Sequence, residues 1–200
     1  MIKRAFDIAL ASVGLIGTSP LWALFAVLIK TEDGGPIFFS QERVGLNGRV
    51  FMAFKFRSMI PDAERHTGPI QATVGDSRVT RIGALLRATA MDELPQLLNI
   101  LRGDMSFVGP RPLRPGEQDS TADGVVQLTT IPGYEERHTV RPGLTGLAQV
   151  YAARDVARAE KFKYDIQYLQ RAGLWLDLQL IIRSVWITVR GRWEAHDPRI

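Results

Sequence analysis

The sequence predicts an α/β fold, mostly helical with short strands, in which an N-terminal membrane helix precedes one compact domain. Three observations lead to this prediction. No charged residue occurs between Ile8 and Ile29, two short apolar and aromatic runs flank a glycine turn at 45–48, and several later segments have helical periodicity. We therefore divide the 200 residues into a re-entrant helix-break-helix anchor at 1–30 and one domain at 31–200 that includes interfacial amphipathic helices.

The uncharged run has the length of a membrane helix, but a proline interrupts it. At about 1.5 Å per residue, a straight helix over Ile8–Ile29 would cross the roughly 30 Å of a bilayer core. Pro20 removes a backbone hydrogen bond and divides the run into two legs, neither of which spans alone. The preceding Ser19 hydroxyl is placed to satisfy a backbone group that this break frees.

Positive charge flanks the run on both sides, with Lys3 and Arg4 before it and Lys30 after it. Because positive residues favour the cytoplasmic face, we expect a re-entrant helical hairpin with both ends on that face, and a kinked spanning helix is the main alternative. A signal peptide and a buried core helix are weaker alternatives, since the run is long for either.

The rest of the chain divides at glycine and proline turns, of which Glu32–Pro36 is the first. We expect short strands at Ile37–Phe39 and Val50–Phe56, an extended segment at Val108–Pro115 and a turn at Arg141–Gly143. The predicted loops are Pro61–Asp76 and Ser120–Gly124, and the predicted helices are Arg78–Arg87, Asp92–Leu101, Val156–Arg171 and Leu174–Arg190.

The last predicted helix carries tryptophan and arginine on an apolar background. Trp175 and Trp186 accompany Arg183 and Arg190. This combination suits a membrane interface, where rings lie at head-group depth and guanidinium groups meet lipid phosphates. An ordinary core helix with a polar edge has the same composition, so both interpretations stay open at this point.

Composition excludes several classes of protein. A hydrophobic content of 46% excludes a wholly disordered chain, and the absence of cysteine excludes disulfides, thiolate metal sites and cysteine nucleophiles. The net charge of +4 indicates an anionic partner, such as lipid head groups or a phosphorylated substrate. His66, His138 and His196 lack metal-ligand spacing, no nucleotide-binding glycine motif is present, and no basic tract with stacking aromatics indicates nucleic acid.

The adjacent carboxylates Asp92 and Glu93 are the sharpest candidates for chemistry. Asp92 also suits a helix N-cap, with Pro95 at the third helical position, where its missing N–H costs nothing. Capping is the commoner role for such a pair. The functional interpretation is that Asp92 and Glu93 hold Mg²⁺ together with substrate phosphates, or that one carboxylate attacks phosphorus.

Candidate phosphate binders are plentiful, and several lie beside glycine or proline, which limits where their side chains point. Arginine presents a planar fork to phosphate oxygens, which makes it the preferred residue for this role. The candidates are Lys55, Arg57, Arg87, Arg102, Arg111 and Arg141.

Taken in order along the chain, these motifs resemble the bacterial sugar transferases, the monotopic polyprenyl-phosphate phosphoglycosyl transferases, in their minimal catalytic form. The resemblance runs from Lys3 to about Val189. The motifs that carry it are Lys3–Asp7, Ser19–Pro20, Gly35–Gly45, Lys55–Met59, Asp92–Asn99, Arg102–Pro112, Arg141–Gly146 and Tyr164–Asp165.

The resemblance implies that residues 31–200 are a catalytic domain at the cytoplasmic face of a bacterial inner membrane. Such enzymes transfer a phosphosugar from a UDP-sugar to polyprenyl (undecaprenyl) phosphate with Mg²⁺, releasing UMP, in the first membrane step of glycoconjugate assembly. The position of Asp92 is that of the nucleophile, which forms a covalent aspartyl-phosphosugar, and Glu93 completes the dyad.

The resemblance also assigns roles to the cations. It implies that Arg111 and Arg141 bind phosphate, with Lys55, Arg57 and Arg87 lining the site; Asp165 and Arg102 are further candidates. Two departures bear on this assignment. Ala90-Met91 replaces the Ser-Leu that precedes the dyad in many relatives, and Tyr151–Arg154 replaces an Asn-Gly-Arg segment, which leaves sugar or nucleotide specificity open.

Two alternatives stay open. A non-catalytic adaptor would bind anionic membrane lipids through the same basic residues, and a transferase without a covalent step would use direct attack. The sugar, the pathway and the oligomeric state, including a homodimer, are not determined by the sequence.

Overall fold

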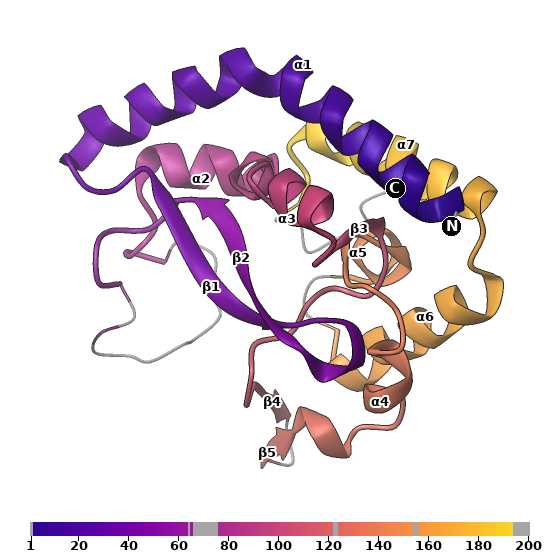
Figure 1. The fold of residues 1–200 in the computed structure, drawn as a ribbon. Coiled ribbons are helices and arrows are strands. Elements are labelled where there is room, and N and C mark those ends of the chain that lie inside the picture. The colour runs from indigo at the N-terminus through magenta and orange to yellow at the C-terminus, as the bar shows by residue number, and fades with distance from the viewer. Residues whose placement is uncertain (1, 64, 66–75, 122–123, 154–155, 194–200) are drawn as a thin grey trace.

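The computed structural model describes residues 2–63, 65, 76–121, 124–153 and 156–193. It is mostly helical with short strands, as predicted. A long helix arches over one side of the molecule, and the rest of the chain packs beneath it (Figure 1). The helices are α1 (Ile2–Asp33), α2 (Arg81–Ala88), α3 (Gln96–Arg102), α4 (Tyr134–Arg137), α5 (Leu147–Tyr151), α6 (Arg158–Arg171) and α7 (Leu174–Arg190).

The described strands form three two-stranded sheets. β1 (Phe38–Val44) and β2 (Val50–Phe56) are antiparallel, with Phe38 opposite Phe56 and Val44 opposite Val50, so the predicted hairpin is confirmed. The strand β1 is longer than the predicted Ile37–Phe39, because its pairing with β2 continues to Val44. β3 (Ser106–Val108) pairs in parallel with β6 (Gly143–Thr145), and β4 (Gln118–Thr121) is antiparallel to β5 (Gly124–Gln127).

The strands β4 and β5 correct the prediction of a loop at Ser120–Gly124. Ser120 pairs with Val125 and Thr121 with Gly124, which adopts a positive φ of 125° that glycine tolerates. Most of the other predicted loop, at 61–76, lies outside the described residues.

The helix α1 runs unbroken through Pro20, so the structure does not confirm the predicted break and hairpin. Pro20 has no N–H to donate to the carbonyl of Ile16, four residues earlier. The Ser19 hydroxyl donates to that carbonyl instead, over 2.8 Å. This substitution, which the sequence predicted, lets the helix continue with its two legs in one arch (Figure 1).

The N-terminal end of α1 is held to the compact domain by polar contacts. Lys3 Nζ lies 2.5 Å from the Asp177 carboxylate on α7. One turn later, the buried Asp7 carboxylate accepts hydrogen bonds from the Ser106 hydroxyl at 3.0 Å and the Phe107 N–H at 3.1 Å, both on β3. This end of α1 therefore contacts both β3 and α7.

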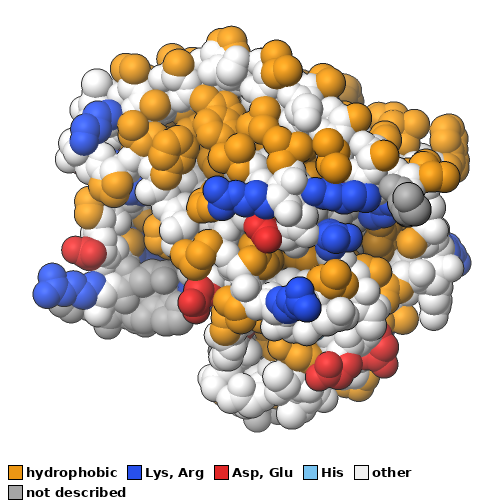
Figure 2. Space-filling model, viewed as in Figure 1, with side chains coloured by type: hydrophobic (Ala, Val, Ile, Leu, Met, Phe, Trp, Pro, Cys, Tyr) orange, Lys and Arg blue, Asp and Glu red, His pale blue; other side chains and the backbone are white. Residues whose placement is uncertain are grey.

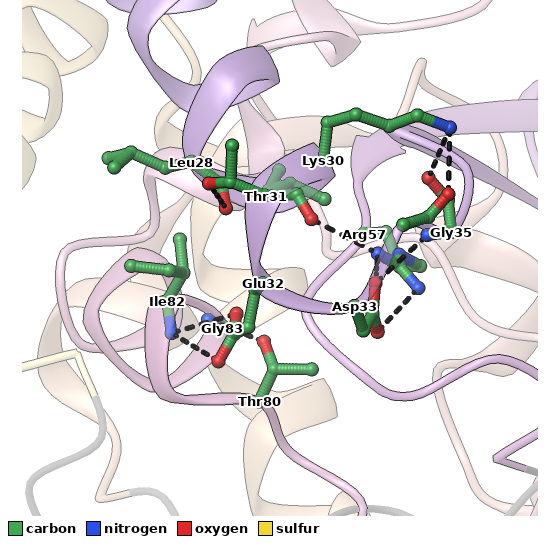
Figure 3. Close-up of polar contacts among 12 residues, drawn as sticks. Leu28, Lys30, Thr31, Glu32, Asp33, Gly35, Arg57, Thr80, Ile82 and Gly83 are labelled. Carbon is green, nitrogen blue, oxygen red and sulfur yellow. Dashed lines mark hydrogen bonds and ion pairs between the residues drawn. The ribbon is translucent and has the colours of Figure 1, made fainter.

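The C-terminal end of α1 is held to the same domain (Figure 3). Glu32 accepts hydrogen bonds from the Arg81 and Ile82 N–H groups at the start of α2, and the Arg57 guanidinium pairs with Asp33. A carboxylate at a helix N-terminus is stabilising because free N–H groups and the helix dipole both favour it. Both ends of α1 are therefore attached to the same compact domain.

Apolar contacts fill the space between α1 and the domain. Ala11 packs with Leu97 and Ile100 of α3, and Phe25 and Ile29 pack with the hairpin and α2. The opposite face of the helix stays exposed, with Val13 67%, Ile16 76% and Val27 60% accessible. Hydrophobic side chains accordingly spread over this edge of the molecule (Figure 2).

The helix α7 has the predicted bounds and two distinct faces. Leu180 and Ile187 are buried, whereas Trp175 is 72% and Trp186 51% exposed. The Arg190 guanidinium lies 4.3 Å from the Trp186 ring centre. An outer face of exposed tryptophan, aliphatic side chains and arginine favours the interfacial interpretation over the core helix.

We predict that Asp7→Ala destabilises the fold. The substitution leaves the buried Ser106 hydroxyl and the Phe107 N–H without their acceptor, at a cost of about 2–4 kcal/mol. Chemical denaturation in detergent solution measures the change, and Glu136→Ala, at an exposed side chain, is the matched control. An unchanged free energy of unfolding for Asp7→Ala would contradict the proposed tether.

Candidate active site

A cleft of about 1800 Å³ opens beneath α1, and its walls differ in chemistry. One wall is largely apolar and comes from α1 and α7, with Leu10, Leu21, Ile181 and Val185 among its residues. The rest of the lining combines apolar side chains, such as Phe56 and Leu113, with a set of cations. The cations that line the cleft include Arg43, Lys55, Arg87, Arg111, Arg114 and Lys161.

The dyad Asp92 and Glu93 lines this cleft, on a 3-10 turn over Met91–Glu93. Both residues are only 7% exposed. The prediction that Asp92 caps a helix is wrong: α3 begins later, at Gln96, and Pro95 occupies its N-cap position. Ala90, with φ 54°, turns the backbone into the 3-10 geometry, so the carboxylates project into the cleft and do not cap N–H groups.

Two cations hold Glu93. Lys55 Nζ lies 2.5 Å from Oε1, and the Arg111 guanidinium lies 2.7 Å from the same oxygen and 3.4 Å from Oε2. Burial by itself would raise the pKa of Glu93, but the charges of Arg111 and Lys55 outweigh it and hold that pKa well below its usual range. Glu93 is therefore a permanent anion within the site.

Asp92 has a different environment from its neighbour. Lys55 Nζ lies 3.8 Å from the Asp92 carboxylate and is already bound to Glu93. Burial, reinforced by the Glu93 charge, raises the pKa of Asp92 to about 6 against the opposing charges of Lys55 and Arg87. Two adjacent carboxylates with pKa values pushed apart are typical of a catalytic pair, in which one carboxylate reacts and the other organises the site.

A buried ion pair supports Arg111 from behind. Arg137 Nε lies 2.9 Å from the Asp165 carboxylate, and a terminal nitrogen of Arg137 donates to the Arg111 carbonyl over 2.6 Å. Both members of the pair are at most 3% exposed. Asp165, a candidate from the sequence, is thus connected to Glu93 of the dyad through Arg137 and Arg111.

The remaining predicted cations have different surroundings in the structure. Arg87 lines the cleft and its charge opposes the raised pKa of Asp92, in agreement with a place at the site. Arg57 also lines the cleft, but its guanidinium is engaged by Asp33 and the Ile29 carbonyl at the end of α1 (Figure 3).

Arg102 and Arg141 lie elsewhere, and neither is among the described residues that line the cleft. Arg102 stacks on the Phe54 ring at 4.8 Å, and Arg141 Nε donates to the Gly103 carbonyl over 2.7 Å. Arg4 of α1 donates to the last carbonyls of α3. The two arginines Arg4 and Arg141 therefore satisfy the C-terminal end of α3, where free carbonyls favour cations.

Glycines allow the loop that carries Arg111 to pack closely against the segment around β6. A Cβ on Gly143 would lie 2.1 Å from the Gly109 nitrogen, and one on Gly146 would lie 2.2 Å from the Gly109 carbonyl oxygen. The loop after β3, which carries Arg111, thus packs backbone against backbone on the segment around β6. No larger residue fits at these positions without moving the loop.

Two further residues of the site had no assigned role from the sequence. The fully buried Asn99 accepts from the Phe54 N–H at 3.0 Å and donates to the Met52 carbonyl at 2.8 Å, which fixes α3 against β2 and the dyad against Lys55. Arg43 lines the cleft from β1. Strand alternation was an available signal for Arg43, because the hairpin register places it on the same face as Lys55.

The dyad fits one mode of magnesium binding. Mg²⁺ is commonly held by one or two carboxylates together with substrate phosphates, and Asp92 and Glu93 supply such a pair, although Glu93 already has two cationic partners. No group of three or more His, Asp or Glu side chains suited to a metal occurs among the described residues. The donor set therefore suits a cation shared with a phosphorylated ligand.

Comparison with known proteins gives a consistent result. A family model described as bacterial sugar transferase matches residues 1–191. The chain is 43% identical over 193 residues to a UDP-N-acetylgalactosamine-undecaprenyl-phosphate N-acetylgalactosaminephosphotransferase of Aeromonas hydrophila, covering 95% of this chain and 44% of that protein. The chain thus spans less than half of that relative.

Two other relatives are covered more fully. A UDP-glucose:undecaprenyl-phosphate glucose-1-phosphate transferase of Caulobacter vibrioides is 44% identical over 190 residues, covering 92% of this chain and 68% of that protein. The exopolysaccharide production protein ExoY of Rhizobium meliloti is 40% identical over 199 residues, covering 92% of this chain and 84% of its own length.

We predict that the two carboxyls of the dyad titrate far apart in the metal-free protein. Carbon-detected NMR of carboxyl-labelled protein should show Asp92 titrating near pH 6 and Glu93 remaining ionised down to the acid limit of the folded state. Since Glu93 raises the pKa of Asp92, Glu93→Gln should move the Asp92 midpoint to lower pH. An Asp92 midpoint near 4 in the unsubstituted protein would contradict this description of the site.

Proposed function

The chain belongs to the bacterial sugar transferase family, and from this premise we propose that it transfers a sugar 1-phosphate from a UDP-sugar to polyprenyl phosphate, with release of UMP. The observation that carries the proposal is the placement of Asp92: a buried carboxylate with a raised pKa, beside a charge-neutralised Glu93, in a cleft lined by apolar and cationic side chains.

We propose that Asp92 is the nucleophile of the first step. A carboxylate oxygen of Asp92 attacks the sugar-bearing phosphorus of the UDP-sugar, the bond from that phosphorus to the bridging oxygen breaks, and UMP leaves with the electron pair. The product is an aspartyl-phosphosugar. At neutral pH a carboxyl whose pKa is about 6 is mostly ionised, yet it is more basic than an ordinary aspartate and therefore a better nucleophile.

The second step would regenerate the carboxylate. An oxygen of the polyprenyl phosphate attacks the same phosphorus, the bond to the Asp92 oxygen breaks, and polyprenyl-diphosphate sugar is released. Both attacks bring anions together, so neighbouring cations must neutralise the phosphates. Arg111, Lys55 and Arg87 line the cleft for that task, and Glu93 keeps Lys55 and Arg111 in place.

The resemblance to the family adds a magnesium ion to this scheme. We propose that Asp92, assisted by Glu93, would hold it together with phosphate oxygens of the substrate. When bound, Mg²⁺ would neutralise the charge of the diphosphate.

The lipid substrate suits the apolar wall of the cleft. This wall is built from α1 and α7, the two helices whose outer faces expose aliphatic side chains and tryptophan. A polyprenyl chain could pass from the bilayer along Leu10, Leu21 and Ile181 with its phosphate toward the dyad. We propose that this arrangement lies at the cytoplasmic face of a bacterial inner membrane.

We propose that α1 enters and leaves the membrane on one face, although it is long and apolar enough to cross. Two contacts support this: Lys3 pairs with α7, and Asp33 pairs with Arg57 on the segment after β2. A spanning helix would separate its ends by the roughly 30 Å hydrocarbon core, so only one end would reach the domain.

Family membership and the buried dyad favour this transferase over a basic adaptor that only binds lipid. An adaptor has no use for two buried carboxylates beside Lys55 and Arg111, because acids there weaken attraction to anionic head groups.

We predict that Asp92→Asn abolishes transfer and the covalent adduct. Purified protein with Mg²⁺, undecaprenyl phosphate and a panel of UDP-sugars is assayed for UMP, and mass spectrometry after exposure to the UDP-sugar alone detects the adduct. Glu136→Gln, at an exposed carboxylate, should retain both. Full turnover by Asp92→Asn, or no UMP from the unsubstituted protein with any UDP-sugar, would refute the proposal; transfer without an adduct under several quench conditions would favour direct attack.

We predict that both ends of α1 are accessible from the cytoplasmic face. The chain has no cysteine, so Ile2→Cys and Thr31→Cys each introduce one label site at an exposed position. In inverted membrane vesicles, a membrane-impermeant maleimide should label both variants, with Glu136→Cys in the domain as a positive control. Labelling of only one end would show a spanning helix.

A further inference from the structure

Arg43 is a half-buried cation whose partners are neutral. Its guanidinium donates to the Pro112 carbonyl at 3.2 Å and to the Gln41 side-chain oxygen at 2.8 Å. It forms no ion pair with a carboxylate of the described part of the chain. Because a charge removed from water usually needs a counter-charge, this arrangement indicates that an anion from outside the chain completes it.

Two other arginines lie on the loop that Arg43 contacts. Arg111 and Arg114 lie on the loop after β3, on either side of the carbonyl that Arg43 contacts, and all three arginines line the cleft. Burial, reinforced by the charges of Arg111 and Arg114, lowers the pKa of Arg43 to about 10. Like charges held together at the wall of a cleft are a cost to the unliganded protein that a polyanionic ligand would offset.

The neighbouring carboxylates, Glu93 and Glu117, pair with groups other than Arg43. Both Glu93 oxygens face Arg111, and Lys55 takes up the shared Oε1. Glu117 accepts the Arg114 N–H over 2.8 Å and pairs with the Arg158 guanidinium. Glu93 and Glu117 moderate the charge at Arg43 without contacting it.

We propose that Arg43 and Arg114, together with Arg111, form a second anion subsite that binds the nucleotide-side phosphate of the UDP-sugar. This inference rests on the proposed function. Arg111 would lie between the two phosphates, because it contacts Glu93 of the dyad and is next to Pro112, whose carbonyl Arg43 contacts. The subsite comes from β1 and the loop after β3, whereas the residues assigned to the lipid come from α1 and α7.

The subsite has a consequence for the first step only. When the bond between the two phosphates breaks, negative charge develops on the phosphate of the departing UMP, and guanidinium groups already in place there stabilise it. After UMP has left, the incoming polyprenyl phosphate reacts at Asp92 and needs no contact with Arg43. Arg43 and Arg114 should therefore act on the nucleotide substrate selectively.

Steady-state kinetics with both substrates test this selectivity. Arg43→Gln should lower kcat/KM for the UDP-sugar roughly 10- to 100-fold, the effect of losing a charge-assisted hydrogen bond, and leave kcat/KM for polyprenyl phosphate within about twofold. Arg114→Gln should act in the same direction, and Arg43→Lys should restore part of the loss. Arg81→Gln, an exposed arginine outside the cleft, is the matched control and should change neither value.

Binding measurements separate this inference from the proposed function. Isothermal titration of the full chain should show that Arg43→Gln weakens binding of UDP and UMP while Arg81→Gln does not. If the unsubstituted protein transfers no sugar phosphate and Arg43→Gln still weakens UDP binding, the proposed function is refuted and the subsite is retained. Unchanged UDP affinity and unchanged kcat/KM for the UDP-sugar in a folded Arg43→Gln or Arg114→Gln variant would overturn the subsite. An equal loss for both substrates would also overturn it, by showing a general structural role.

Discussion

The contact of Glu93 with Lys55 and Arg111 is the interaction on which the candidate site depends. It joins three separate parts of the chain: Lys55 on β2, Glu93 on the 3-10 turn before α3, and Arg111 on the loop after β3. The strength of this contact keeps Glu93 ionised, and that fixed negative charge, together with burial, raises the pKa of Asp92. Removing Glu93 would therefore free two cations and change the reactivity of its neighbour at once, so the pair works as a unit.

A second constraint is the attachment of α1 at both ends. Asp7 fixes the N-terminal part to β3, and Asp33 fixes the C-terminal end through Arg57. The helix thereby becomes one wall of the cleft and presents an apolar outer face. In the proposed function, this geometry solves the problem of a substrate with a polar head and a membrane-soluble tail: the dyad lies close to the surface from which the tail comes. Ser19 contributes by keeping the arch continuous at Pro20.

Much of the fold followed from local pattern. The bounds of α7 and β2 agree with the predicted ones, and the turn residues predicted the hairpin, although β1 is longer than expected. Asp92, Glu93, Lys55, Arg87 and Arg111 were all expected to line one site, as they do. The expectation went too far for other arginines. Arg57 lines the cleft as expected but pairs with Asp33 of α1, whereas Arg141 satisfies the end of α3 and Arg102 stacks on Phe54. A guanidinium suits phosphate, carboxylate, carbonyl and aromatic partners equally well, so residue type alone does not select among them.

The sequence by itself determined the elements and the chemistry available to them: a long apolar helix, a hairpin, an amphipathic C-terminal helix, two adjacent carboxylates and no thiol. Tertiary structure decided which groups meet. It directed Asp92 into a cleft where the sequence also allowed a helix cap, linked Asp165 through Arg137 to Arg111, and placed Arg43 against the loop that carries Arg111 and Arg114. The physical reason is the distance along the chain over which each property is determined. Helices, strands and turns depend on neighbours within a few residues, whereas ionisation and ligand affinity depend on charges and burial contributed by segments far apart in the chain.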